Sequence, residues 1–166
     1  VTLKTKDNVQ LKGWWIPSSK PSDKAIIVVH GRGGNRNIGM RYAPTLHNAG
    51  FHLLTFDLRR FGKSQRVQST MGHHEQNDVI AAIDFVEKKG MKHIGVFAFS
   101  MGAATSLMVM ARDQRIKAGV FEGGFSDAAT VLQENAKRRY GLPKYPLLPL
   151  VFQLVNWRAK MDIHAI

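Results

Sequence analysis

Four short apolar runs, spaced along the chain and rich in β-branched residues, constrain the fold more than any other feature of the sequence. Such runs are typical of strands that are buried on both faces, as in a parallel sheet. Between them, apolar residues recur at helical spacing. Strands that alternate with helices predict an α/β fold with a doubly wound, mainly parallel sheet. The four runs are residues 25–29, 51–56, 94–99 and 118–121.

Helices are expected between these strands because each intervening segment places its apolar residues on one face. At the N-terminus, residues 2–5 and 11–16 read as two strands joined by a turn at Asp7-Asn8, and they are expected to form an antiparallel edge of the sheet. The expected helical faces are Ile38, Tyr42 and Leu46; Val79, Ile83 and Val86; and Ala104, Leu107, Met108 and Ala111.

The pattern changes after Ser126, which suggests a core over residues 1–127 and a helical, cap-like segment over residues 128–166. Residues 128–140 are expected to form one helix. Beyond it, residues 145–157 are apolar and aromatic but too short to cross a bilayer. Three prolines, Pro143, Pro146 and Pro149, are expected to interrupt this stretch, which fits a cap over the sheet or an element at an interface.

Ser100 lies at the junction between the strand 94–99 and the helix that follows. A tight strand-to-helix turn would raise its hydroxyl above the sheet edge and would point the amide of Met101 at an oxyanion. Such a turn needs small residues two positions before and two after the serine, and these are Ala98 and Gly102. The alternative is that Ser100 is an ordinary N-cap.

The glycine-rich segment that begins with His30 and Gly31 follows the strand 25–29 directly. In an acyl-transfer enzyme, the amide of Arg32 would be the second oxyanion donor, and His30 would be structural. A dinucleotide-binding loop is a rival interpretation, with Asp57 at the end of the next strand. In that interpretation Arg36 stands where a third glycine is required.

Taken together, four motifs resemble the α/β-hydrolase family, in particular its esterase, lipase and dipeptidyl-peptidase-like members. The resemblance runs in order from Asp7 to about Asp127. His30-Gly31 resembles the start of the oxyanion loop, and residues 57–64 resemble the Asp-x-Arg-Gly-x-Gly-x-Ser loop, with Arg60 where glycine is usual. Residues 72–78 resemble the start of the helix before the nucleophile strand, and residues 98–102 resemble the nucleophile elbow. This implies an α/β-hydrolase sheet whose C-terminal strands would follow residue 166.

The family order of catalytic residues is serine, then acid, then histidine. After Ser100 the chain offers Asp113, Asp127 and Asp162 as acids and only His164 as a histidine, and Asp127 is the acid that could lie at the active edge of the sheet. An imidazole base must be held in place by packing. A residue at a chain terminus lacks such packing. We therefore expect that the chain stops before its acid and base, and that this fragment alone is nearly inactive.

The resulting hypothesis is a serine hydrolase that cleaves a small-molecule ester or acyl substrate through an acyl-Ser100 intermediate. A peptidase or a thioesterase would use the same serine chemistry, and a non-catalytic, hydrolase-like binding module is the alternative of a different class. We expect no cofactor and no metal: cysteine is absent, and the adjacent His73 and His74 are expected to point apart on a helix. These two histidines therefore suggest no metal site.

The net charge of +12 is large for 166 residues. It suggests an anionic surface as a partner or, equally, a longer protein whose other part carries compensating acid. The lack of an aromatic-rich RNA signature argues against nucleic acid. Basic residues concentrate in one stretch without acids, residues 137–160, which holds Lys137, Arg138, Arg139, Lys144, Arg158 and Lys160.

Overall fold

The computed structural model describes residues 1–141, 147–160 and 162–163. The chain divides into two compact units, Val1–Gly124 and Phe125–Ile166, which are described separately below. No helix in these described ranges is long and apolar enough to cross a membrane.

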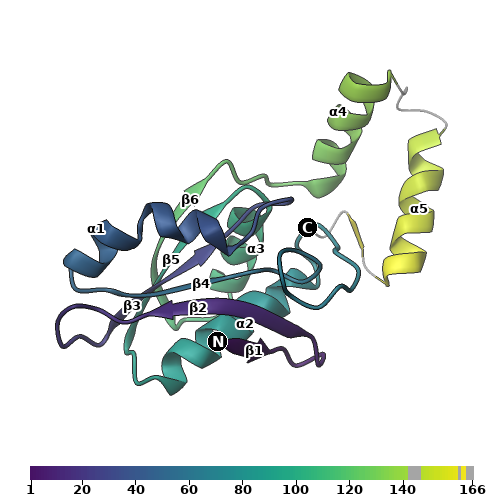
Figure 1. Cartoon of the computed structure of the whole chain (residues 1–166). Coiled ribbons are helices and arrows are strands. Elements are labelled where there is room, and N and C mark those ends of the chain that lie inside the picture. Colours follow the sequence, from purple (N-terminus) through teal and green to yellow (C-terminus); the bar gives the residue numbers. More distant parts are fainter. Residues whose placement is uncertain (142–146, 161, 164–166) are drawn as a thin grey trace. The chain divides into compact units, whose positions relative to one another are not determined.

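A six-stranded mixed sheet forms the centre of the first unit (Figure 1). Its order is β1-β2-β4-β3-β5-β6, in which β1, β2 and β4 pair antiparallel and β4, β3, β5 and β6 pair parallel. The expected parallel sheet with an antiparallel N-terminal strand pair is therefore confirmed. The strands are β1 (Thr2–Lys4), β2 (Gln10–Ile16), β3 (Lys24–Val29), β4 (His52–Phe56), β5 (His93–Phe99) and β6 (Ile116–Glu122).

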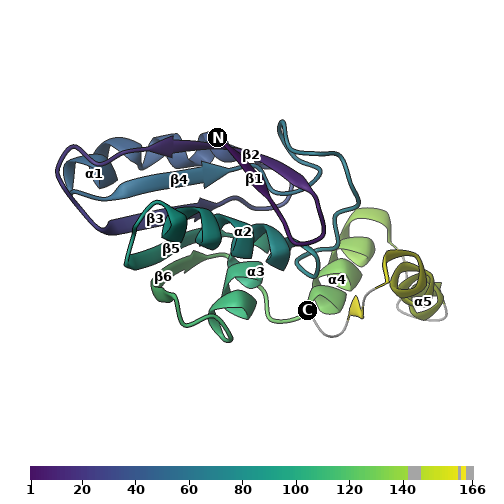
Figure 2. The same ribbon diagram turned by 90° about the horizontal axis from the view of Figure 1, so that it is seen from below.

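Helices cover both faces of this sheet, as Figure 2 shows. The short 3₁₀ helix η1 (Arg36–Arg41) and α1 (Ala43–Asn48) lie on one face, and α2 (Glu75–Lys88) and α3 (Met101–Met110) lie on the other. On the α2 and α3 side, Ala25, Ile27 and Val29 of β3 are fully buried. On the opposite side, Val28 and Leu53 pack against α1. Each fully buried aliphatic side chain contributes roughly 1.5–3 kcal/mol, so β3 anchors the core from both faces.

The expected helix that carries Ile38, Tyr42 and Leu46 is divided in two. Pro44 lies in the first turn of α1, where its missing N–H is tolerated, but its ring would clash with a preceding helical turn. The chain therefore forms η1, turns at Tyr42 and begins α1 anew. Tyr42 still reaches the sheet, with its ring 4.5 Å from that of Phe97.

The strand β6 is longer than expected and is not buried on both faces. It occupies the edge of the sheet, where β5 is its only partner among the described residues. Residues 117–120 are exposed, and Val120 is 61% exposed. Residues 118–121 were expected to be buried on both faces, and that expectation is wrong because an apolar run does not distinguish a central strand from an edge strand.

The second unit contains α4 (Ala128–Tyr140) and α5 (Leu147–Ala159). The carboxylate of Asp127 caps α4 by accepting hydrogen bonds from the amides of Ala129 and Thr130, and Gly141 ends the helix in a left-handed conformation, with φ of 65°. Pro149 lies in the first turn of α5 and does not interrupt it, since the first-turn amides lack intrahelical acceptors. Pro143 and Pro146 fall outside the described residues.

Candidate active site

The loops that follow β3, β4 and β5 lie at one edge of the sheet, because these strands are parallel and their carboxyl ends meet there. They carry His30 to Arg36, Asp57 to Ser64, and Ser100. In open α/β sheets, ligands bind outside the carboxyl ends of the strands. This edge is therefore the candidate active site.

Ser100 turns the chain between β5 and α3 with φ of 50° and ψ of −122°. A positive φ is unfavourable for any residue with a Cβ and persists only where the surroundings enforce it. Here the Ser100 amide donates to the Glu122 carbonyl on β6 at 2.8 Å, and the Ser100 carbonyl accepts from the amides of Ala103 and Ala104. The turn leaves Ser100 exposed.

Small residues allow α3 to pack closely against the end of β3. A Cβ placed on Gly102 would lie 2.5 Å from the His30 carbonyl oxygen and 2.8 Å from that of Val29. Ala98 is fully buried and pairs with Val29 in the sheet. A side chain at position 102 would therefore push α3, and Ser100 with it, away from β3.

The loop after β3 contacts Ser100 directly. A Cβ placed on Gly31 would lie 2.9 Å from the Ser100 Cβ and 3.5 Å from its Oγ. Within the described ranges, the backbone amides of Arg32 and Met101 donate no hydrogen bond to the protein. These two amides directly follow Gly31 and Ser100, the two residues in contact, and the Met101 amide is at the N-terminus of α3.

His30 ties this loop to the loop after β4. Its ring is buried, Nδ1 donates to the Gly31 carbonyl at 2.7 Å, and Nε2 accepts from the Leu58 amide at 3.0 Å. Because Nε2 accepts, the ring is the neutral tautomer with its proton on Nδ1. Burial lowers the pKa of His30 below its ordinary value, although the Gly31 carbonyl and Asp57 act in the opposite direction.

This buried ring is expected to make folding sensitive to acid. The pKa of His30 is lower in the folded than in the unfolded chain, so its contribution to stability falls as the pH drops below about 6.5. The loss is at most about 1.4 kcal/mol per pH unit. Urea unfolding of the wild type and of His30→Asn should show a shallower pH dependence for the variant. Parallel curves for the two proteins between pH 7.5 and 5.5 would contradict this.

Asp57 makes a second link between the same two loops. Its Oδ1 accepts from the Arg36 amide at 2.7 Å, and its Oδ2 accepts from Arg36 Nη1 at 2.9 Å and from the Lys63 amide at 2.8 Å. Gly62, with φ of 52°, leaves no space for a Cβ beside this carboxylate. Asp57 is 1% exposed, and its carboxylate is occupied within the protein. A dinucleotide-binding loop would instead need this carboxylate to accept from the hydroxyls of a ribose.

Arg59 holds the loop after β4 onto the rest of the unit, a role that was not predicted from the sequence. Its guanidinium binds Asp78 of α2 through Nε at 2.9 Å and Nη2 at 2.7 Å, and Asp7 through Nη1 at 2.8 Å. Arg59 and Asp78 are both buried. The only sequence signal was the arginine of the loop motif, and it does not identify partners that lie 19 and 52 residues away.

Arg60, which replaces a glycine of the family motif, has φ of 73°. Left-handed backbone costs a non-glycine residue about 1–2 kcal/mol in the folded state. Glycine would remove this cost, but its greater freedom in the unfolded chain reduces the gain in stability by about 0.4–1 kcal/mol. Arg60→Gly is therefore expected to raise the free energy of unfolding by about 0.5–1 kcal/mol, measured in urea. Lys63→Gly, at another exposed cation of this loop, should instead lower it; a decrease in both variants would refute the strain argument.

The remaining predicted residues are placed elsewhere. Asp127 caps α4, as described above, and His164 lies outside the described residues. His73 and His74 precede α2 rather than pointing apart on it, and their rings meet edge to face, 4.9 Å apart. Within the described part of the chain, no group of three or more His, Asp or Glu side chains could hold a metal ion.

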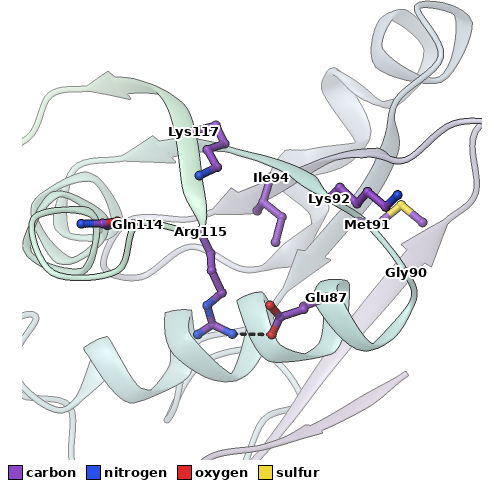
Figure 3. Close-up of a pocket in the computed structure, with 8 residues that line it drawn as sticks. All are labelled: Glu87, Gly90, Met91, Lys92, Ile94, Gln114, Arg115 and Lys117. Atoms are coloured by element: carbon purple, nitrogen blue, oxygen red, sulfur yellow. Dashed lines mark hydrogen bonds and ion pairs between the residues drawn. The ribbon is translucent and has the colours of Figure 1, made fainter.

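A hollow of about 590 Å³ lies at the opposite edge of the sheet, where β5 and β6 begin and α2 ends (Figure 3). Arg115 extends across it to Glu87 at 2.7 Å, and Ile94 of β5 also lines it. Ser100 follows the far end of β5. This hollow is therefore separate from the candidate active site.

Comparison with known proteins places the chain in a family. The alpha/beta hydrolase fold family matches residues 24–148. The uncharacterized protein YfhR of Escherichia coli K12 is 32% identical over 143 residues, which cover 81% of this chain and 50% of YfhR. The uncharacterized protein Rv2307c of Mycobacterium tuberculosis is 30% identical over 154 residues, which cover 90% of this chain and 50% of that protein. The chain thus spans about half the length of these curated relatives.

Among solved structures, an esterase of Pyrococcus furiosus, Pf2001, is similar with a TM-score of 0.74 and 30% identity, over 98% of this chain and 66% of the esterase. A second crystal form of the same esterase gives the same TM-score over 91% of the chain. The sheet order, the strained turn at Ser100 and these matches lead to one conclusion: the chain belongs to the alpha/beta hydrolase fold family.

Proposed function

We propose that this chain contributes the nucleophile and the oxyanion donors of a serine hydrolase that cleaves carboxylic esters. The observation that carries the proposal is the exposed Ser100 at positive φ, with Gly31 packed against its side chain. Strained backbone of this kind concentrates at functional sites. A strand-to-helix turn with these angles presents the serine hydroxyl at the edge of the sheet.

In the proposed reaction, Ser100 Oγ attacks the ester carbonyl carbon while a base accepts its proton. The carbonyl oxygen becomes an oxyanion, and the amides of Arg32 and Met101 would donate to it. One such donor is worth roughly 10²–10³ in rate. The alcohol leaves with a proton, and water then releases the acyl group from Ser100 as a carboxylic acid.

The ester as substrate class is supported by the similarity to the esterase of Pyrococcus furiosus, which is 30% identical. We expect the 166-residue chain by itself to be nearly inactive, with the base and acid of the triad outside it. An enzyme that lacks a triad member retains only about 10³–10⁴-fold catalysis over water.

A fluorophosphonate probe, which forms a covalent bond with activated serines, tests this proposal. The probe should label Ser100 in a form of the protein that includes the regions matching the full length of its relatives, and Ser100→Ala should abolish the labelling. Ser106→Ala serves as the matched control on α3, since Ser106 is buried and should not react. If the wild type is not labelled, the non-catalytic binding module becomes the better interpretation.

A further inference from the structure

A polar hollow of about 280 Å³ opens between the two loops that His30 and Asp57 hold together. It lies at the carboxyl edge of the sheet, on the β4 side of β3, whereas Ser100 follows β5 on the other side. A water molecule occupies about 30 Å³ in the liquid, so the hollow has room for a small charged group. Its lining residues are Asn35, Arg36, Asn37, Asp57, Gly62 and Lys63.

The lining carries a net positive charge. The one acid, Asp57, is buried and accepts hydrogen bonds from Arg36 and from the Lys63 amide, so Arg36 neutralises it. Arg36 Nη1 donates to this carboxylate, and within the described ranges the other guanidinium N–H groups of Arg36 donate to no protein acceptor. Lys63 forms no ion pair with any described residue. One uncompensated cation therefore remains, beside the amide side chains of Asn35 and Asn37.

The residues around the hollow add to its positive charge. Residues 30–41 and 57–66 together contain seven lysines and arginines but a single acid, Asp57. Among the other cations of these two segments, only Arg59 forms an ion pair with any residue that the structure describes, and its partners are Asp7 and Asp78. A concave site lined by one sign of charge raises the local concentration of oppositely charged ligands.

We propose that this hollow, here called the Arg36–Lys63 hollow, binds the oxyanion group of a small molecule, a phosphate or a carboxylate. Arginine presents several donors in a fixed plane that matches such a group, and lysine adds a point charge. Asn35 and Asn37 can donate to the oxygens that remain. The proposal does not depend on catalysis by Ser100, because it concerns a separate part of the sheet edge.

Calorimetric titration of the 166-residue chain with inorganic phosphate, and separately with acetate, tests the proposal at an ionic strength held constant with sodium chloride. We expect saturable binding of at least one of the two anions, and the stronger one identifies the preferred group. Lys63→Gln should weaken this binding about tenfold or more, because a charge-assisted hydrogen bond is lost. Lys20→Gln, at an exposed lysine at the other edge of the sheet, is the matched control and should bind as the wild type does.

Three results would overturn the proposal. Heats that do not saturate, or that sodium chloride reproduces, would mean that the anions only screen surface charge. Equal affinity in Lys63→Gln and the wild type, with both folded by circular dichroism, would place any bound anion elsewhere, for instance at the amides beside Ser100. Weakening by Lys20→Gln to the same extent would show that net charge, not the hollow, determines binding.

Discussion

Arg59→Met is expected to lower the free energy of unfolding by about 3–5 kcal/mol, because it leaves the buried carboxylate of Asp78 without its counter-charge. The side chains of Arg59 and Asp78 are 3% and 0% exposed, and the guanidinium supplies two hydrogen bonds to Asp78 and two to Asp7. Methionine fills similar space but satisfies none of these acceptors. Urea unfolding followed by circular dichroism measures the loss.

Two further variants separate charge from packing. In Arg59→Met combined with Asp78→Asn, the buried charge is gone, so part of the lost stability should return. Arg66→Met removes an exposed arginine near the same loop and should change stability by less than about 0.5 kcal/mol. If the double variant is no more stable than Arg59→Met, the loss arises from packing rather than from an unpaired carboxylate.

The pH dependence gives an independent check. Burial raises the pKa of Asp78 to about 6, against the opposing effect of the Arg59 guanidinium. Without Arg59 this pKa should rise further, and a raised carboxyl pKa favours the folded state as pH falls through it. The destabilisation by Arg59→Met should therefore be smaller at pH 5 than at pH 8.

Gly102→Ala is expected to destabilise the chain by about 3 kcal/mol, although helix propensity alone predicts the opposite sign. Alanine in place of glycine inside a helix normally stabilises by roughly 0.5–1 kcal/mol. At Gly102, however, the new Cβ would meet two backbone carbonyl oxygens, at 2.5 and 2.8 Å, and backbone cannot rotate away as a side chain can. Overpacking typically costs 1–3 kcal/mol and occasionally more.

The free energy of unfolding in urea separates the two effects, because helix propensity predicts an increase for Gly102→Ala and packing predicts a decrease. Leu107→Ala, at a residue of the same helix that is 45% exposed, should be tolerated far better and serves as the control. A stabilised Gly102→Ala would mean that α3 does not pack against the end of β3 as described. The close packing of α3 on β3, which supports the turn at Ser100, would then be wrong.

Local sequence patterns predicted the strands and helices of this fold well, because each is dictated by neighbouring residues. The runs at 25–29 and 94–99 became β3 and β5, and residues 128–140 became α4. The order of strands was not accessible in the same way. Nothing local to β4 indicates that it lies between β2 and β3.

At the candidate site too, local features could be predicted from the sequence and long-range contacts could not. The spacing of Ala98, Ser100 and Gly102 predicted a tight turn, and Arg60, which departs from the glycine of the family motif, has a φ of 73°. The contacts of Arg59 and the hydrogen bond that the His30 ring accepts from the Leu58 amide depend on residues far along the chain. Such long-range partners leave no periodic trace in a single sequence.

The double link between the two loops, through His30 and through Asp57, has an evolutionary consequence. A substitution in either loop alters the support of the other, so the effects of paired changes are coupled rather than additive. Divergence at this edge of the sheet would therefore proceed through compensated sets of mutations, and single replacements drawn from a relative would be poor guides to the behaviour of the whole set.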